Sequence, residues 1–304
     1  MKFIFFSVLL AGVFVVRAEE TLQVASLSTV LTEVAQAVGG DKVEVTGIIK
    51  PGTDPHAFSP TTGDVKTLSR SKVVLLSGYG MEAAYLTKLE KSVGEGPEFV
   101  TIGQFIKPIM VEADHDHHDH GHSHGHSHEG EIVPDPHWWH SIKNVEIATD
   151  AVRKAFIKAD PANKATYEAN AASYQRKLEA LAKWAKMEMA RLPRDRRILV
   201  TSHDAFGYFA RDYDFKVLPI AGLSTKDQPS SQKVRTIIED IKKEGVKAIF
   251  VENIENPKVL TEITRETGAK KGGTLYADGL GTGDASTYEG MIRHNYGTIV
   301  SALE

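Results

Sequence analysis

The chain has 304 residues, of which 41% are hydrophobic and 25% are charged, and its formal net charge is −4. This balance is typical of globular proteins, and the length allows two ordinary domains. The mildly acidic charge gives no electrostatic reason to bind nucleic acid, and the absence of cysteine excludes thiolate metal sites, thiol catalysis and a disulfide framework.

Residues 1–18 are typical of a secretory signal peptide. Lys2 gives a positive start, residues 3–16 are apolar, and Val16-Arg17-Ala18 offers a cleavage site after Ala18. An N-terminal anchor helix is the alternative, but the apolar run is shorter than the about 20 residues that span a bilayer. No cysteine follows for a lipid anchor. We therefore expect export to the periplasm and a soluble mature chain.

Short apolar runs and helical patterns alternate from Thr21 onward, which predicts a mostly parallel sheet flanked by helices. We assign residues 19–159 to an N-terminal α/β lobe. Its predicted strands are Leu22–Leu27, Val43–Ile49 and Val73–Leu76, and its predicted helices are Leu31–Val38, Gly63–Ser71 and Glu82–Leu89.

The middle of the chain predicts one long helix over residues 160–192. Asp160-Pro161 is a favourable helix start, and Leu192-Pro193 is a stop. An apolar stripe runs between them through Tyr167, Ala171, Tyr174, Leu178, Leu181 and Ala185. A coiled-coil segment is the alternative, but a helix lying across two lobes fits better because lobes occur on both sides of it in the sequence.

Residues 193–304 repeat the strand–helix alternation, which predicts a C-terminal α/β lobe. The predicted strands are Ile198–Thr201, Lys216–Ile220, Ala248–Val251 and Thr274–Ala277, and the predicted helices are Ala205–Tyr213, Ser231–Glu244 and Pro257–Thr267. The expected fold is therefore α/β, with two lobes, each a mostly parallel sheet flanked by helices, joined by one long rigid helix.

Eight of the 13 histidines fall within residues 114–129: His115, His117, His118, His120, His122, His124, His126 and His128. The interleaved Gly, Ser and Asp leave no apolar face, so we expect a mobile loop. Neutral imidazole favours Zn, Cu, Ni and Co. We expect secondary, weaker metal binding here, although a functionless insert is the alternative.

Four other residues indicate a compact metal site. His56 follows a predicted strand and turn, His137 lies in Asp-Pro-His-Trp-Trp, and His203 and Asp278 each follow a predicted strand. Open α/β sheets bind ligands at the carboxyl ends of their strands. His203 also lies at the start of a predicted helix, which is expected to keep its ring neutral.

The remaining candidates are weaker. His140, three residues after His137, is a possible auxiliary ligand, and His294 is interpreted as a surface residue. Glu252 also follows a strand and is a reserve carboxylate, although a salt bridge explains it as well.

At these residues the chain resembles the zinc and manganese class of solute-binding proteins of ABC importers. The matching motifs are residues 43–59, Asp135-Pro136-His137-x-Trp139, Ser202-His203-x-Ala205-Phe206, and Tyr276-x-Asp278-x-Leu280 followed by Tyr288-x-x-Met291. The resemblance covers essentially the mature chain. It implies His56, His137, His203 and Asp278 as the metal ligands, in a cleft between two lobes.

Two features favour the zinc branch. The His-rich insert occurs in the zinc-binding members that the sequence resembles, and manganese members tend to have a carboxylate where this chain has His203. Three imidazoles and one carboxylate suit tetrahedral Zn²⁺, whereas Mn²⁺ prefers oxygen-rich sites. One departure is His140-Ser141-Ile142, where the family often has Leu-Asp-Pro.

The expected function is high-affinity capture of Zn²⁺ and its delivery to an ABC-type importer, without catalysis. The expected partner is the membrane permease, with a zinc metallochaperone as a further candidate, and we expect a monomer that binds no nucleic acid. A manganese-binding counterpart, a zinc-dependent hydrolase with Asp278 as general base, and a surface adhesin are the alternatives. No HExxH helix, nucleophile elbow or phosphate-binding glycine loop supports an enzyme.

Overall fold

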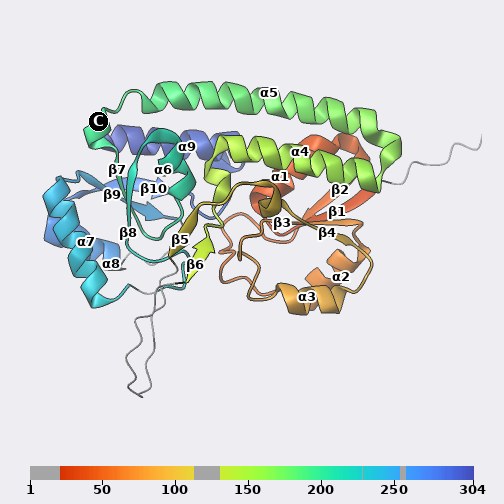
Figure 1. Ribbon diagram of the computed structural model, residues 1–304, viewed down its shortest axis with the longest axis horizontal. Coiled ribbons are helices and arrows are strands. Elements are labelled where there is room, and N and C mark those ends of the chain that lie inside the picture. Colours follow the sequence, from red (N-terminus) through yellow and green to blue (C-terminus); the bar gives the residue numbers. More distant parts are fainter. Residues whose placement is uncertain (1–20, 113–130, 228, 254–257) are drawn as a thin grey trace, which may run out of the picture.

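The chain forms two four-stranded parallel sheets with helices around them (Figure 1). The computed structural model describes residues 21–112, 131–227, 229–253 and 258–304. The predicted signal peptide and the His-rich segment, with all eight of its histidines, lie outside the described residues.

The first sheet has the strand order β2-β1-β3-β4. Its strands are β1 (Leu22–Ser26), β2 (Val43–Gly47), β3 (Val73–Leu76) and β4 (Glu98–Thr101), and its helices are α1 (Thr29–Gly39), α2 (Thr62–Arg70) and α3 (Leu86–Val93). All four residues of β3 are buried, as expected of a central parallel strand that is covered on both faces. The sequence analysis does not assign β4.

Helix α3 starts four residues later than the predicted helix Glu82–Leu89. The side chain of Glu82 accepts hydrogen bonds from the backbone N–H of Ser77 and Gly78, at 2.7 and 3.0 Å. Gly78 and Gly80 have φ values of +84° and +87°, so the backbone turns here before a helix can begin.

The second sheet has the order β10-β9-β7-β8 and is again parallel. Its strands are β7 (Ile198–Thr201), β8 (Lys216–Pro219), β9 (Ala248–Glu252) and β10 (Lys270–Leu275), and its helices are α6 (Gly207–Tyr213), α7 (Ser231–Glu244) and α8 (Lys258–Thr267). When the strands of each sheet are numbered by appearance, both orders are 2-1-3-4. The prediction of an α/β fold with two parallel sheets is confirmed.

Strand β10 ends two residues before the predicted strand Thr274–Ala277 does. The Asn295 side chain occupies both backbone groups of Tyr276, with N–H to Oδ1 at 2.9 Å and Nδ2 to O at 2.8 Å. These bonds replace the strand ladder, so the chain leaves the sheet after Leu275.

Three further long helices complete the fold: α4 (Ile142–Ala159), α5 (Lys164–Met189) and α9 (Tyr288–Leu303). Helix α5 packs against α1, α4 and α9, and Figure 1 shows it lying along both halves. The predicted stripe from Tyr167 to Ala185 is buried. The α-helix is shorter than the predicted residues 160–192, because a 3₁₀ turn, Pro161–Asn163, precedes it and α-helical geometry stops at Met189.

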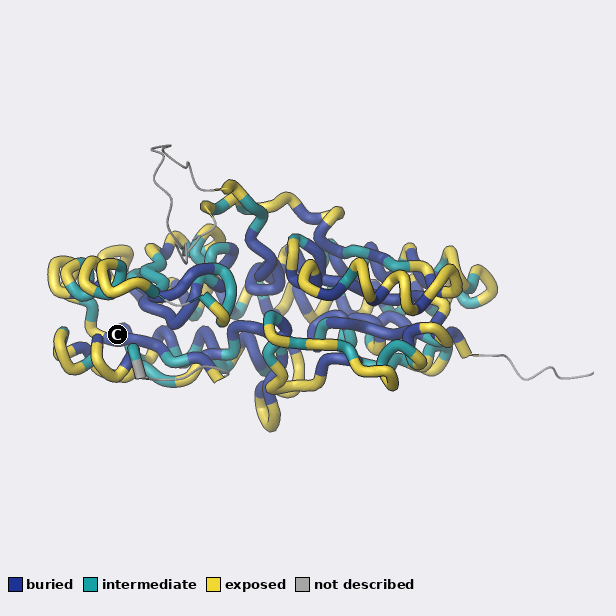
Figure 2. Tube along the Cα trace, turned by 90° about the horizontal axis from the view of Figure 1, so that it is seen from below, coloured by how far each residue is buried: buried dark blue, intermediate teal, exposed yellow. Residues whose placement is uncertain are grey.

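One hydrophobic cluster runs without interruption from the first half into the second. It contains Val24 and Val73 of the first sheet, Leu199 and Phe250 of the second, and residues of α4, α5 and α9. Figure 2 shows buried backbone along the interior of both halves. The halves are therefore joined by a shared core as well as by α5, and separating them would expose apolar surface to water.

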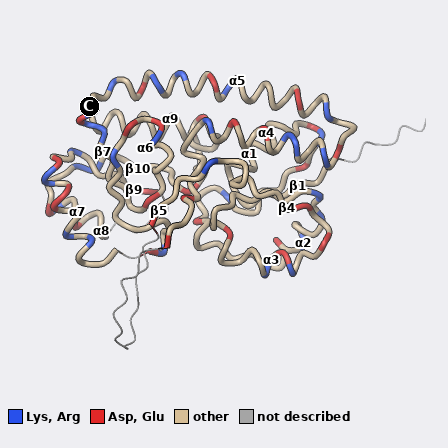
Figure 3. The backbone as a smooth tube through the Cα atoms, in the orientation of Figure 1, with Lys and Arg blue, Asp and Glu red and all other residues tan. Residues whose placement is uncertain are grey.

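The surface carries both signs of charge, interspersed along the helices (Figure 3). Asp150, for example, pairs with Lys154 at 2.7 Å on α4. A short antiparallel hairpin, β5 (Met110–Glu112) and β6 (Ile132–Pro134), leads into the segment that contains His137. Within the described ranges, no helix combines the length and the apolar character that a membrane span requires.

Candidate metal centre

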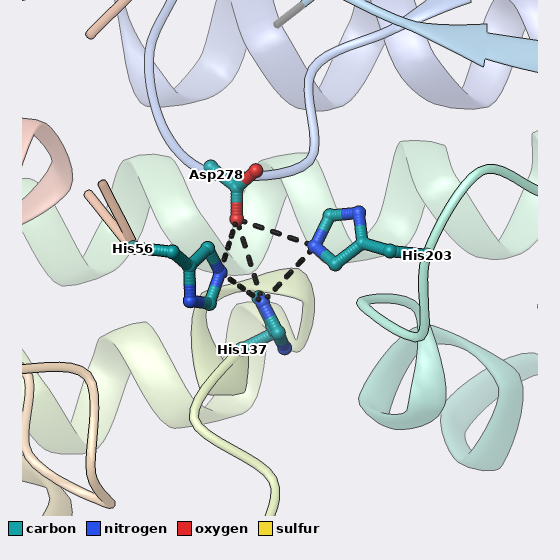
Figure 4. Close-up of side chains that lie close together, drawn as sticks. All are labelled: His56, His137, His203 and Asp278. Atoms are coloured by element: carbon teal, nitrogen blue, oxygen red, sulfur yellow. Dashed lines mark hydrogen bonds and ion pairs between the residues drawn. The ribbon is translucent and has the colours of Figure 1, made fainter. Parts of the chain in front are cut away.

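Four side chains from distant parts of the chain converge between the two sheets (Figure 4): His56, His137, His203 and Asp278. His56 lies between β2 and α2, His137 after β6, His203 after β7 and Asp278 after β10. One donor atom from each side chain lies within 4.8 Å of the other three. The structure thus brings together the four residues that the sequence analysis singled out as the primary site.

Five of the six distances between the four donor atoms are close to the edges of a small tetrahedron. Asp278 Oδ1 lies 3.1 Å from His56 Nε2 and 3.4 Å from both His137 Nε2 and His203 Nε2. His137 Nε2 is 3.3 Å from His56 Nε2 and 3.4 Å from His203 Nε2. Donors held about 2.0–2.1 Å from a central Zn²⁺ have tetrahedral edges of about 3.3–3.4 Å.

The ring of His203 is held by Glu252 at the end of β9. The carboxylate contacts His203 Nδ1 and accepts the backbone N–H of Ser202 and His203 at 3.0 and 3.2 Å. Glu252 is therefore not a member of the four-residue cluster but orients one of its rings, a common arrangement around metal-binding histidines.

The expectation that a helix start keeps His203 neutral is wrong. Helix α6 begins only at Gly207, and a carboxylate lies beside the ring instead. Burial by itself would lower the pKa of His203, but the charges of Glu252 and Asp278 raise it well above its ordinary value.

His137 has a similar partner two residues away in Asp135. The Asp135 carboxylate accepts the backbone N–H of His137 at 2.8 Å and lies 2.9 Å from its Nδ1. Burial lowers the pKa of His137, but hydrogen bonds to Asp135 and Asp278 raise it overall. A cation that binds the Nε2 atoms of His137 and His203 therefore competes with protons for them.

His56 is held differently, through its backbone. Asp54 Oδ1 accepts the N–H of His56 at 2.8 Å, and Asp54 Oδ2 accepts the hydroxyl of Thr225 from the second half at 2.7 Å. In the described part of the chain no carboxylate contacts His56 Nδ1. The side chain is 8% exposed, whereas those of His137 and His203 are fully buried.

Asp278 brings the carboxylate of the cluster. Burial would raise its pKa, but His203, His137 and His56 hold it well below its usual value, so Asp278 is ionised. Its loop is fixed to the first half, because Leu280 N–H donates to Thr29 Oγ1 at 2.8 Å. Gly279 has φ +141°, and a Cβ there would lie 2.3 Å from the same oxygen, so glycine permits this close approach.

The two weaker histidine candidates bond backbone carbonyls and do not join the cluster. His140 is fully buried, and its Nε2 is 2.8 Å from the Ala277 carbonyl. His294 is on α9, with Nε2 2.9 Å from the Thr274 carbonyl. Neither ring is among the four convergent groups.

Sequence reasoning missed the supporting roles of Asp135, Asp54, Thr225 and Thr29. An acidic residue two positions before a candidate histidine was the available signal for Asp135 and Asp54, because Asp side chains often accept the backbone N–H two residues on. Thr225 and Thr29 act across long sequence separations and carry no local signal.

Comparison with known proteins identifies the family to which the chain belongs. A family model described as "Zinc-uptake complex component A periplasmic" matches residues 24–302. The manganese-binding lipoprotein MntA of Bacillus subtilis is 34% identical, over 94% of this chain and 91% of its own length. The iron-binding protein YfeA of Yersinia pestis is 31% identical, over 92% and 86%.

Among solved structures, the periplasmic zinc-binding protein TroA from Treponema pallidum superposes with a TM-score of 0.82 at 26% identity, covering 93% of this chain and 99% of TroA. Fold, length and sequence thus agree along nearly the whole chain. The chain therefore belongs to the ZnuA family, whose members are the periplasmic metal-binding components of ABC transporters and not enzymes.

Proposed function

We propose that this protein captures Zn²⁺ with high affinity through His56, His137, His203 and Asp278 and delivers it to an ABC-type zinc importer. The observation that carries the proposal is the convergence of three imidazoles and one carboxylate in a cluster buried between the two sheets, with five of the six donor spacings at 3.1–3.4 Å. This donor set suits tetrahedral zinc.

Zinc is preferred to manganese on ligand chemistry. Mn²⁺ lies at the weak end of the divalent series and favours carboxylate, carbonyl and water ligands, whereas imidazole suits zinc. The relatives with the names MntA and YfeA are described as manganese-binding and iron-binding, and TroA as zinc-binding. A manganese-binding counterpart is therefore the alternative that the experiment must address.

The arrangement suits transport rather than catalysis. Catalytic zinc keeps a coordination position open for water, but here Asp278 supplies a fourth donor. Family membership also removes the hydrolase alternative. His56 and His137 come from the first half and His203 and Asp278 from the second, so a bound ion links both halves to each other.

The wider setting follows from the family. An ABC importer requires a permease and an ATPase, and we propose that the permease receives the ion in the periplasm after the signal peptide is removed near Ala18. Loading by a zinc metallochaperone is a further proposal. We also expect the eight histidines of residues 114–129 to bind additional ions through their imidazoles, more weakly than the central site does.

A metal competition experiment tests this proposal. The mature chain, and a variant lacking residues 114–129, are titrated with Zn²⁺ and then challenged with excess Mn²⁺ or Fe²⁺. We expect one tight zinc ion in both proteins, weaker ions only in the full chain, and no displacement by Mn²⁺. Equal or tighter binding of Mn²⁺ would overturn the choice of metal, and loss of the tight ion in the deletion variant would overturn the choice of site.

A further inference from the structure

The carbonyl oxygen that precedes Asp278 accepts two buried ring N–H groups. Trp139 Nε1 donates to the Ala277 carbonyl at 2.9 Å, and His140 Nε2 lies 2.8 Å from the same oxygen. Both donors belong to the 3₁₀ turn Trp138–His140, which directly follows His137. One short segment therefore carries a proposed zinc ligand and also grips the backbone beside another.

We propose that His140 is a positioning residue of the metal centre: by holding the Ala277 carbonyl it fixes the Asp278 carboxylate against the three imidazoles. This inference rests on the proposed function of the cluster. Because a carbonyl oxygen only accepts hydrogen bonds, Nε2 of His140 must carry the proton, so this nitrogen has no lone pair for a metal.

The His140 ring is held by burial and stacking, whereas its Nδ1 has no hydrogen-bond partner among the described residues. It is fully buried and stacks on Phe206, three residues after His203, with ring centroids 4.4 Å apart at 29°. Burial and the neighbouring His137 lower the pKa of His140 to about 4, which keeps the ring neutral. Its backbone carbonyl accepts the hydroxyl of Tyr296 from α9 at 3.0 Å. The donor thus has one direction in which to point, toward Ala277.

The surrounding contacts make this bond consequential for Asp278. On one side, Asn295 holds Tyr276 by two hydrogen bonds, and on the other, Thr29 holds Leu280 N–H. Between Tyr276 and Leu280, the first half holds the backbone next to Asp278 through the Ala277 carbonyl, which accepts the N–H groups of Trp139 and His140. Loss of one of its two donors lets the loop relax while the fold around it remains.

Three variants separate the donor from the bulk of the ring. His140→Phe keeps the stack on Phe206 and removes the N–H, whereas His140→Gln places an amide nitrogen the same number of bonds from the backbone. His294→Phe is the matched control, because His294 Nε2 also bonds a backbone carbonyl. This is the carbonyl of Thr274 in β10, at 2.9 Å, and the bond is exposed. For each protein one measures zinc affinity by chelator competition, the zinc dissociation rate, and the absorption spectrum with Co²⁺ as a probe.

We expect His140→Phe to bind zinc about 10-fold more weakly, mainly through faster dissociation, as is usual when a partner behind a metal ligand is lost. The Co²⁺ spectrum should remain that of a four-coordinate site. His140→Gln should recover most of the affinity, and His294→Phe should match the wild type.

Unchanged affinity in His140→Phe, or no recovery in His140→Gln, would overturn the positioning role, and a Co²⁺ spectrum showing a lost nitrogen ligand would make His140 a ligand instead. If His140→Phe does not fold, His140→Met also lacks the donor and gives the same comparison with His140→Gln. A wild-type protein without a tight zinc site would refute the proposed function itself, which is a separate result.

Discussion

The histidines on the two sides of the metal centre differ in burial and in the contacts that hold their rings. His137 and His203 are fully buried, and each has a carboxylate at Nδ1, from Asp135 and Glu252. His56 is 8% exposed, and in the described chain no carboxylate contacts its Nδ1, since Asp54 bonds only the His56 backbone. The ligand pair deep in the molecule is oriented in advance, and the outer ligand is not.

This contrast indicates which ligands lose the least rotational freedom when the metal binds. A ring fixed by a carboxylate loses little rotational freedom when it binds a metal, and its Nε2 lone pair already points toward the ion. A ring that is held only through its backbone must lose that freedom on binding. We therefore expect the His56 side to be where an ion enters and leaves, because fewer contacts must break there.

Removing a ligand from each side gives the largest expected effect. Four ligands share about 10–16 kcal/mol in structural zinc sites, so one contributes about 2.5–4 kcal/mol, or about a 70-fold to 1,000-fold change in affinity. We expect His203→Ala to reach the upper end, because it also removes the ring that the buried Glu252 carboxylate contacts, and His56→Ala to stay near the lower end. Chelator competition at constant pH measures both.

His294→Ala serves as the control for a general effect of losing an imidazole. The comparison between the two sides fails if His56→Ala costs as much affinity as His203→Ala or more.

Glu82, which closes the turn at Ser77 and Gly78 near His137, makes a contribution to stability that depends on pH. Burial raises the pKa of Glu82 from 4.5 to about 7, against the opposing effect of its backbone hydrogen bonds. The turn that it closes includes the Ser77 carbonyl, which accepts Trp138 Nε1 at 3.2 Å beside His137. Because the folded-state pKa is above the unfolded value, this contribution to stability is full below pH 4.5 and is lost as the pH rises through 7.

The size of this effect is about 3 kcal/mol across that range. Urea unfolding of the metal-free protein and of Glu82→Gln between pH 5 and 8 measures it. We expect the wild type to lose stability relative to the variant as the pH rises, and parallel stability curves would show that the pKa of Glu82 is not raised.

The carboxylates behind the two buried rings come next. Asp135→Asn and Glu252→Gln keep the size of each side chain and remove its charge, so each should weaken zinc binding by about 10-fold to 100-fold. Asp54→Asn should cost less, because Asp54 does not touch the His56 ring. Equal losses in all three variants would remove the distinction between the buried and the outer side.

The sequence predicted most of what local patterns can encode. Apolar runs located the strands from β1 to β3 and from β7 to β9, and the stripe from Tyr167 to Ala185 located the buried face of α5. The four convergent residues came from motif resemblance together with their places after strands, because the carboxyl ends of parallel strands gather at one edge of a sheet.

What the sequence did not reveal depends on contacts between distant residues. The role of Glu252 required knowing that β9 lies beside β7, and that of His140 required the position of Ala277, 137 residues away. The helix predicted from Glu82 begins later because the Glu82 side chain bonds to the backbone of a turn. The spacing of apolar residues does not show such a bond.

The smallest expected effect concerns the bond that ties the outer ligand to the second half. Thr225 Oγ1 donates to Asp54 Oδ2 at 2.7 Å, and Asp54 in turn holds the backbone of His56. Thr225→Val keeps the shape and removes the hydroxyl, which should cost about 1 kcal/mol or less for one partly exposed hydrogen bond. We expect zinc to dissociate a few-fold faster from this variant, while the association rate and the stability of the metal-free protein change little.

Stopped-flow mixing of the zinc-loaded protein with excess chelator measures the dissociation rate, and Thr225→Ser, which retains the hydroxyl, should behave as the wild type. If Thr225→Val releases zinc at the wild-type rate, this bond does not restrain the outer side, and the slow step of release must lie among the buried ligands.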